Sequence, residues 1–327
     1  MSLAMVPLGR TGTTVSELAF GTWRFGRQND DGEVEVGRDR AHELLDAYAA
    51  AGGNFIDTAD MYGDGASERY IGDWLGERDR EEFVVASKIF WPTREDANGR
   101  GLNRKHLRRQ MDRILDRLGT DYVDLLYIHR WDDETPVEEF MRTLDGFVRD
   151  GKVNYLGTST LEPNAWKVVK ANELADKRGY EPFKVAQPRY NAVNREIEGN
   201  YLDMCADYHI GVVPWSPLAG GFLTGKYARD ERPPADSRAA NDQRFADSYL
   251  TPSNFDTLEQ VEEVAEAVGA SPAQVSLAWL MHHPQVTAPI VGARTVDQLG
   301  ENVAAADIDL TPEQFERISV AKRRVSA

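Results

Sequence analysis

The sequence predicts one α/β domain over residues 1–327, a (β/α)8 TIM barrel with an N-terminal β-hairpin and a long loop after the seventh strand. Three observations predict this fold. Short apolar runs alternate with helical patterns, eight such runs can be distinguished, and most recur at the spacing of one βα unit, roughly 30 residues. Barrels of this kind often reach such a length as a single domain.

The first segment, MVPLGRTGTTVSELAF, holds two short apolar runs on either side of residues 9–14. This pattern predicts a β-hairpin ahead of the repeating part. Helix 38–51 then follows and stops at Gly52, and helix 103–118 opens at Asn103 and stops at Gly119. Each helix is followed directly by an apolar run, as a βα repeat requires.

The predicted strands end near eight positions: Gly21, Asp57, Lys88, His129, Ser159, Gln187, Pro214 and Val291. Six of the seven intervals have the length of one βα unit, and the last is long enough to hold an insertion as well. The insertion covers 219–253 and is polar and proline-containing. Such a segment in a compact domain is usually a lid or a disordered excursion.

A doubly wound sheet is the alternative architecture. It would carry a glycine-rich GxGxxG turn after its first strand. That turn reads FGTWRFGRQND here, and no GxGxxG occurs in the chain, so the barrel is favoured. The later helices begin with the capping patterns Ser271-Pro272 and Thr311 with Gln314.

The composition narrows the classes of partner. A formal charge of −16 and a pI near 4.9 argue against nucleic acid and anionic membranes, so a small-molecule partner is expected. Only nine of the 38 basic residues are lysines, which suits a halophilic protein or an ordinary acidic protein from an arginine-biased genome, and both remain open. One cysteine, Cys205, and no long apolar segment predict a cytoplasmic protein.

Three ionisable residues end predicted strands: Asp57 in NFID, Lys88 in FVVASK and His129 in DLLYIH. Tyr62 lies in the loop after Asp57. In a barrel, catalytic groups project from these strand ends. One such residue alone is more often structural, but four together indicate a site.

The four residue types suit protonation of a developing alkoxide. Tyr62 would be the proton donor, and the Lys88 ammonium should lower its pKa from the usual value of about 10. Asp57 would keep Lys88 charged, and His129 would donate to or orient a carbonyl oxygen.

With these residues the chain resembles the aldo-keto reductase superfamily. The resemblance extends from the hairpin to PIVGARTVDQLGEN, and DTADMYGDGASE is its most specific motif. It implies a catalytic tetrad of Asp57, Tyr62, Lys88 and His129, and NADPH-dependent reduction of aldehydes or ketones to alcohols.

The resemblance also implies residues that bind NADP(H). Thr22 and Trp23 would approach the nicotinamide, Ser159 and Gln187 would hold its carboxamide, and Trp215 would stack on its ring. Many relatives have asparagine where this chain has Thr160, which puts one carboxamide hydrogen bond in doubt. The full implied set is Thr22, Trp23, Asp57, Ser159, Gln187, Trp215, Ser216, Pro217, Leu218, Gly220, Lys226, Gly292, Arg294, Gln298 and Asn302.

GGFLTGKY satisfies the GxxxxGK of a phosphate-binding P-loop, but Tyr227 stands where that motif needs the Ser or Thr that holds Mg²⁺. The resemblance instead places this stretch over the pyrophosphate, with Lys226 as a donor; a plain glycine-rich loop is the alternative. GARTVDQLGEN opens a helix after the last strand, where an anion is favoured. Arg294 is thus expected at the ribose 2′-phosphate, with a solvated surface charge as the alternative.

Other functions remain open. Lys88 is compatible with a Schiff-base aldolase, and some relatives are cofactor-binding regulatory subunits of membrane channels. Trp23, Trp91 and Trp131 lie just beyond strand ends and would wall a substrate pocket, or anchor their loops. The expected partner is a small carbonyl or alcohol substrate; no metal site is expected, and neither the substrate nor the oligomeric state can be predicted.

Overall fold

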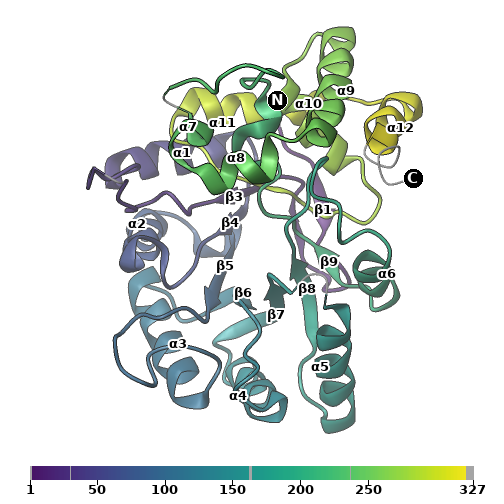
Figure 1. Ribbon diagram of the computed structural model, residues 1–327. Coiled ribbons are helices and arrows are strands. Elements are labelled where there is room, and N and C mark those ends of the chain that lie inside the picture. The colour runs from purple at the N-terminus through teal and green to yellow at the C-terminus, as the bar shows by residue number, and fades with distance from the viewer. Residues whose placement is uncertain (1, 30, 162–163, 236, 322–327) are drawn as a thin grey trace.

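Eight parallel strands form the centre of the protein, in the order β10-β3-β4-β5-β6-β7-β8-β9. The computed structural model describes residues 2–29, 31–161, 164–235 and 237–321. The two ends of the sheet meet, because Thr287 N donates to Val212 O at 2.7 Å and Ile290 N donates to Pro214 O at 2.8 Å. The strands therefore curl into the predicted (β/α)8 fold, with helices around them (Figure 1).

The strand bounds agree closely with the sequence prediction. The antiparallel hairpin pairs β1 with β2. The strands are β1 (Met5–Pro7), β2 (Thr14–Ser16), β3 (Ala19–Gly21), β4 (Phe55–Asp57), β5 (Val84–Ile89), β6 (Val123–Ile128), β7 (Val153–Ser159), β8 (Phe183–Gln187), β9 (Gly211–Val212) and β10 (Ile290–Val291).

Helices α3 and α10 begin at the capping residues that the sequence indicates. The Asn103 side chain accepts a hydrogen bond from His106 N, and Ser271 and Gln274 form a complete capping box. The helices are α1 (Arg38–Ala50), α2 (Ala66–Leu75), α3 (Arg104–Leu118), α4 (Val137–Arg149), α5 (Ala165–Arg178), α6 (Asn200–Asp207), α7 (Arg238–Asn241), α8 (Gln243–Tyr249), α9 (Pro252–Val268), α10 (Pro272–Met281), α11 (Val296–Val303) and α12 (Pro312–Ala321). Four 3-10 turns are η1 (Tyr62–Gly65), η2 (Arg80–Glu82), η3 (Ala219–Thr224) and η4 (Ala304–Asp307).

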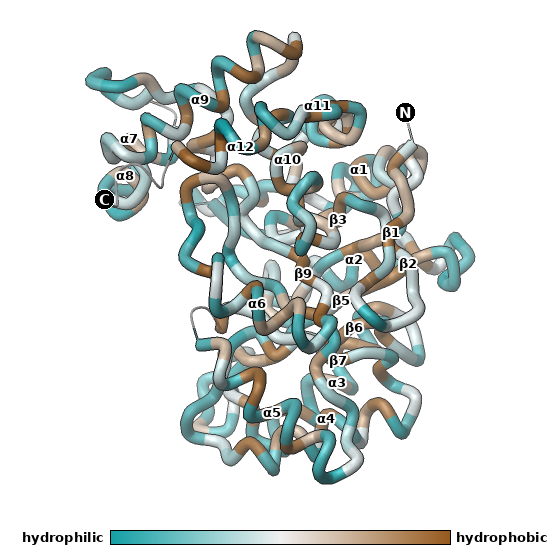
Figure 2. Tube along the Cα trace, turned by 90° about the vertical axis from the view of Figure 1, so that its right-hand side faces the viewer, coloured by the Kyte–Doolittle hydropathy of each residue, from teal (hydrophilic) through white to brown (hydrophobic). Residues whose placement is uncertain are grey.

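Two apolar layers hold the barrel together. One fills its interior and the other lies between strands and helices. Figure 2 shows hydrophobic residues along the central strands and alternating hydrophobic and hydrophilic residues along the surrounding helices. In β5, Val84 and Ala86 belong to the inner layer and Val85 and Ile89 to the outer one. Because side chains alternate along a strand, Lys88 is directed inward with Val84 and Ala86.

The same alternation places other polar residues inside the barrel. Phe55 lies in the inner layer, so Asp57 faces the same way, and Tyr127 of the inner layer directs His129 inward. Gln187 follows Val185 in the same manner. The polar groups thus gather at one end of the barrel, above an apolar interior.

The insertion after β9 forms short helical segments in its described part. It contains η3, α7 and α8, and an aromatic cluster joins it to α9. Its rings belong to Phe222, Tyr227, Phe245, Tyr249 and Phe255. Phe245 and Tyr249 lie 4.8 Å apart between centroids. Among the described residues, no helix has the length and apolar character needed to cross a membrane.

Candidate active site

Four predicted residues meet at the C-terminal ends of β4, β5 and β6. Lys88 Nζ donates to Asp57 Oδ1 at 2.5 Å, to the Thr58 carbonyl oxygen at 2.7 Å and to the Tyr62 hydroxyl at 3.3 Å. The rings of Tyr62 and His129 lie edge to face, with 6.0 Å between their centroids. The structure therefore brings together Asp57, Tyr62, Lys88 and His129.

The charge of Lys88 depends on its neighbours, since the side chain is completely buried. Burial acts to lower its pKa, but Asp57 and Tyr62 outweigh burial and raise the pKa above its usual value. Burial also raises the pKa of Asp57, and the charge of Lys88 opposes it. Lys88 is therefore held as an ammonium with three acceptors around it.

The sequence predicts that the pKa of Tyr62 is lowered, and this prediction is wrong. Burial raises the pKa of Tyr62, and the nearby Lys88 ammonium, which lowers it, does not compensate. The sequence indicates the ammonium of Lys88 but not the extent to which the Tyr62 phenol is buried. Tyr62 is therefore a protonated phenol at neutral pH, which is the form that a proton donor needs.

His129 is neutral in this environment. Burial and then the charge of Lys88 lower its pKa well below the usual value. Its Nδ1 is buried and has no hydrogen-bond partner within the described residues. A neutral imidazole carries one N–H donor, which suits an oxygen that develops charge.

The residues expected at the nicotinamide are linked to Asp57. Gln187 Nε2 donates to Asp57 Oδ2 at 2.8 Å, and Ser159 Oγ donates to the Gln187 carbonyl oxygen at 3.1 Å. Thr22 Oγ1 donates to the Asp57 carbonyl oxygen at 2.9 Å. Trp215 is partly buried, and its Nε1 lacks a partner in the described part of the chain.

Thr160, the departure from the family pattern, has a strained backbone. Its φ is +54°, in the left-handed region that a β-branched residue rarely adopts. Asparagine tolerates this region better than threonine. The hydroxyl of Thr160 lies 3.3 Å from Ser159 Oγ, so it contacts the group expected to hold the carboxamide.

The glycine-rich loop brings left-handed backbone close to a cation. Ser216, Pro217 and Leu218 lead from Trp215 into η3, where Gly220 and Gly221 have φ of +64° and +96°. A Cβ on Gly221 would lie 3.2 Å from Lys226 Nζ. A backbone in this conformation beside an ammonium suits a pyrophosphate.

The loop after β10 has its own fixed geometry. Gln298 Oε1 accepts a hydrogen bond from Arg294 N at 2.9 Å, and the side chain of Asn302 reaches the Gly292 carbonyl oxygen at 3.5 Å. Gln298 and Asn302 are thus engaged with the loop itself. The Arg294 guanidinium is exposed, and no hydrogen bond or ion pair engages it among the described residues. Lys226 and Arg294 are cations and Trp215 is an aromatic ring, and these are the kinds of group that suit an anionic dinucleotide.

The three tryptophans differ in position. Trp91 lies at the site, with its ring centroid 6.2 Å from that of His129. Trp23 is exposed, and the Arg27 guanidinium lies 3.7 Å over its ring. Trp131 packs edge to face against Phe140 of α4, which favours a role as a loop anchor.

A buried acidic cluster beside the tetrad was missed by the sequence reasoning. Glu68 accepts hydrogen bonds from Ser87 Oγ and from Arg117 Nε, both at 2.6 Å. Both carboxylate oxygens of Asp60 are buried and lack a partner in the described part. Burial, followed by the charge of Glu68, raises the pKa of Asp60 well above its usual value. The sequence held a signal for this cluster, because DTADMYGDGASE contains three acids besides Asp57, and two of them, Asp60 and Glu68, are buried here.

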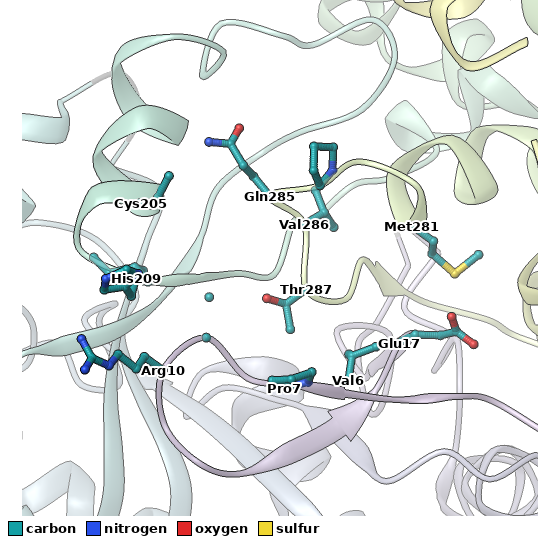
Figure 3. A pocket seen from close by; sticks show the side chains of 15 residues that line it. Val6, Pro7, Arg10, Glu17, Cys205, His209, Met281, Gln285, Val286 and Thr287 are labelled. Carbon is teal, nitrogen blue, oxygen red and sulfur yellow. The ribbon is translucent and has the colours of Figure 1, made fainter. Parts of the chain in front are cut away.

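A separate cavity lies at the opposite end of the barrel. Figure 3 shows it between the hairpin, the α6–β9 turn and the loop that leads to β10. It encloses about 560 Å³ and is lined among others by Pro7, Arg10, His209 and Thr287. Arg10 and His209 are exposed, and the guanidinium of Arg10 is directed away from the centre of the cavity in this view. This cavity is therefore distinct from the tetrad.

Comparison with known proteins agrees with this geometry. A model of the aldo/keto reductase family matches residues 17–322. The probable voltage-gated potassium channel subunit beta of Oryza sativa subsp. japonica is 38% identical over 320 residues, which cover 95% of this chain and 94% of that protein. The uncharacterized oxidoreductase YrpG of Bacillus subtilis is 35% identical, with 94% and 92% covered. Norsolorinic acid reductase of Aspergillus flavus is 34% identical, with 95% and 79% covered.

Proposed function

The chain belongs to the aldo/keto reductase family, and from this premise we propose that it is an NADPH-dependent reductase of aldehydes or ketones, with Tyr62 as the general acid. The observation that carries the proposal is Lys88 Nζ within reach of both Asp57 and Tyr62 at the C-terminal end of the barrel. The substrate would be a small carbonyl compound, with Trp23 and Trp91 as apolar walls.

Tyr62 would donate its proton to the substrate oxygen as the carbonyl becomes an alcohol. The raised pKa keeps the phenol protonated before the reaction. Once the proton has left, the phenolate would be stabilised by the Lys88 ammonium, 3.3 Å away. Asp57 and the Thr58 carbonyl oxygen hold that ammonium in position, and His129 would donate to the same substrate oxygen.

The cofactor would extend across residues of several loops. Bound NADPH would supply the hydride that the carbonyl carbon accepts. Ser159 and Gln187 would hold the nicotinamide carboxamide, Trp215 would cover the ring, and Lys226 with the η3 backbone would hold the pyrophosphate. Arg294 would pair with the 2′-phosphate, and the insertion at 219–253 would act as a lid over the cofactor.

The test is a panel of aldehydes and ketones, with loss of NADPH absorbance and formation of alcohol measured together. We expect alcohol to form mole for mole with NADPH oxidised for at least one class of carbonyl compound. No oxidation above background across aliphatic, aromatic and quinone carbonyls would contradict the proposal.

A regulatory channel subunit is the second candidate, because the relative from Oryza sativa is described as such and is 38% identical. The reductases lie only a few per cent lower, so identity does not discriminate. Steady NADPH turnover supports the reductase, whereas binding of NADPH without turnover supports the subunit. A Schiff-base aldolase is disfavoured, since it needs a neutral amine and Lys88 is a buried ammonium with three acceptors.

A further inference from the structure

The loops that follow β3 and β10 begin side by side at the end of the barrel that carries the tetrad. Strand β10 pairs in parallel with β3, with Val291 opposite Phe20. A Cβ on Gly292 would lie 3.5 Å from the Gly21 carbonyl oxygen. Each loop then carries an arginine within three residues of this contact, Arg24 in one and Arg294 in the other.

Arg24 is held by an acid from the same loop. Its Nη1 donates to Glu35 Oε1 at 2.8 Å; the Glu35 side chain is largely buried, and that of Arg24 is partly buried. Arg27 Nη1 lies 3.8 Å from Glu35 Oε2, while the Arg27 guanidinium stacks on Trp23. The orientation of Arg24 is therefore fixed before any ligand arrives.

Arg24 has charged neighbours of both signs. Arg24, Arg27 and Arg294 contribute three guanidinium groups, and Glu35 is the carboxylate that pairs with two of them. Burial lowers the pKa of Arg24, Glu35 opposes this effect, and the positive charge of Arg294 lowers the pKa further. Two like charges are thus close enough to repel each other in a chain whose net charge is −16. An anion between them would remove the repulsion.

We propose that Arg24 is a second guanidinium for the adenosine 2′-phosphate, which it approaches from the β3 loop while Arg294 approaches from the β10 loop. This inference rests on the proposed function, since it presumes that a 2′-phosphorylated dinucleotide binds here. Arg24 then determines the preference for NADPH over NADH together with Arg294. Glu35 orients Arg24.

The test uses two fragments that lack the nicotinamide, 2′,5′-ADP and 5′-AMP, which differ only in the 2′-phosphate. Dissociation constants are measured by titration calorimetry for wild type, Arg24→Gln, Arg294→Gln and the double variant. Arg27→Gln is the matched control, because it removes a guanidinium of the same cluster that stacks on Trp23. Arg24→Lys keeps the charge but loses the planar fork.

We expect Arg24→Gln to weaken 2′,5′-ADP about ten- to a hundredfold and to leave 5′-AMP within about twofold, as for the loss of a charge-assisted hydrogen bond. Arg24→Lys should lie between Arg24→Gln and wild type, and Arg27→Gln should be close to wild type. In the double variant the two losses should not add, because each arginine contacts the same phosphate.

Two failures can be distinguished. If wild type prefers 2′,5′-ADP and Arg24→Gln keeps the full preference, or weakens both fragments equally, the role of Arg24 is overturned and the proposed function stands. If wild type binds the two fragments equally well, the 2′-phosphate site in the proposed function is itself wrong. A melting temperature close to that of wild type shows that a loss of affinity is not a loss of fold.

Discussion

Single residues at the tetrad illustrate what a sequence does and does not reveal. The strand-end positions of Asp57, Lys88 and His129 were predictable, because an apolar run marks each strand and side-chain alternation sets its direction. The pKa of Tyr62 was not predictable, because its shift depends mainly on the burial of the phenol, which the sequence does not show. The left-handed backbone of Thr160 was likewise hidden, since nothing in its neighbours demands φ of +54°.

Asp60 gives a prediction on stability and pH. Its folded pKa is raised well above the unfolded value of about 3.9, so the native state binds more protons between the two pKa values. The contribution of Asp60 to the free energy of unfolding is therefore present at low pH and lost as pH rises through the folded pKa. Asp60→Asn has no such loss. We expect its stability relative to wild type to increase from about pH 4 to pH 8, measured by urea unfolding.

Asp132→Asn is the control of opposite sign. Burial alone would raise the pKa of Asp132, but hydrogen bonds from Leu102 N, Thr135 Oγ1 and Glu134 N outweigh burial and lower the pKa. Its contribution to stability is present above the unfolded pKa and is lost as pH falls through the folded pKa. Asp132→Asn should therefore be most destabilised at neutral pH. If the stability of both variants relative to wild type changes with pH in the same direction, the raised pKa assigned to Asp60 is wrong.

At the scale of elements, capping residues and periodicity predicted both bounds of α1 and α3 and the starts of α10 and α12. Asn103 and Ser271 open their helices as expected, and Gly119 ends α3 in the left-handed region. The short helices of the insertion were not predicted, because four to seven residues are too few for a periodic pattern. The Tyr249 ring of α8 stacks on Phe222 of η3, which in turn contacts Phe255 of α9, and sequence spacing does not show these contacts.

The crossing of α2 and α3 supplies a matched pair of glycine substitutions. A Cβ on Gly72 of α2 would lie 2.4 Å from the Arg117 carbonyl oxygen of α3, whereas a Cβ on Gly146 of α4 would meet nothing within 4 Å. Gly72→Ala should destabilise the protein by about 1–3 kcal/mol through overpacking. Gly146→Ala should stabilise it by up to about 1 kcal/mol through helix propensity. Urea unfolding of both variants tests this, and an equal gain in stability for the two would contradict the close crossing.

At the scale of the whole molecule, net charge is the dominant electrostatic feature. The chain carries 54 acidic and 38 basic residues. Many of its ion pairs are exposed, such as Lys152 with Asp112 and Arg38 with Asp73. Exposed pairs of this kind contribute little to stability, so screening them with salt should destabilise the protein only slightly. The same screening weakens the repulsion among the excess acids, and we expect this stabilising effect to be the larger one.

We therefore predict that the melting temperature and the activity rise as KCl is increased from tens of millimolar to molar. The Debye length falls from about 30 Å at 0.01 M to about 3 Å at 1 M salt, which screens the repulsion. The measurement is thermal unfolding across this range, with sucrose at equal osmolality as a control for excluded solute. A melting temperature that stays constant or falls as KCl increases would contradict adaptation to high salt. An arginine-biased genome would then explain the low lysine content.

The assignment of Tyr62 as the proton donor is the central claim, and its direct test is Tyr62→Phe with NADPH and an accepted carbonyl substrate. Turnover should fall about 10²- to 10⁴-fold, the usual cost of losing a general acid, while the dissociation constant for NADPH stays within about twofold. Tyr155→Phe is the control, since its hydroxyl donates to the Thr11 carbonyl oxygen of the hairpin, and it should retain wild-type turnover. If Tyr62→Phe keeps more than about half of the wild-type turnover, a loss far below that expected for a general acid, Tyr62 is not the proton donor.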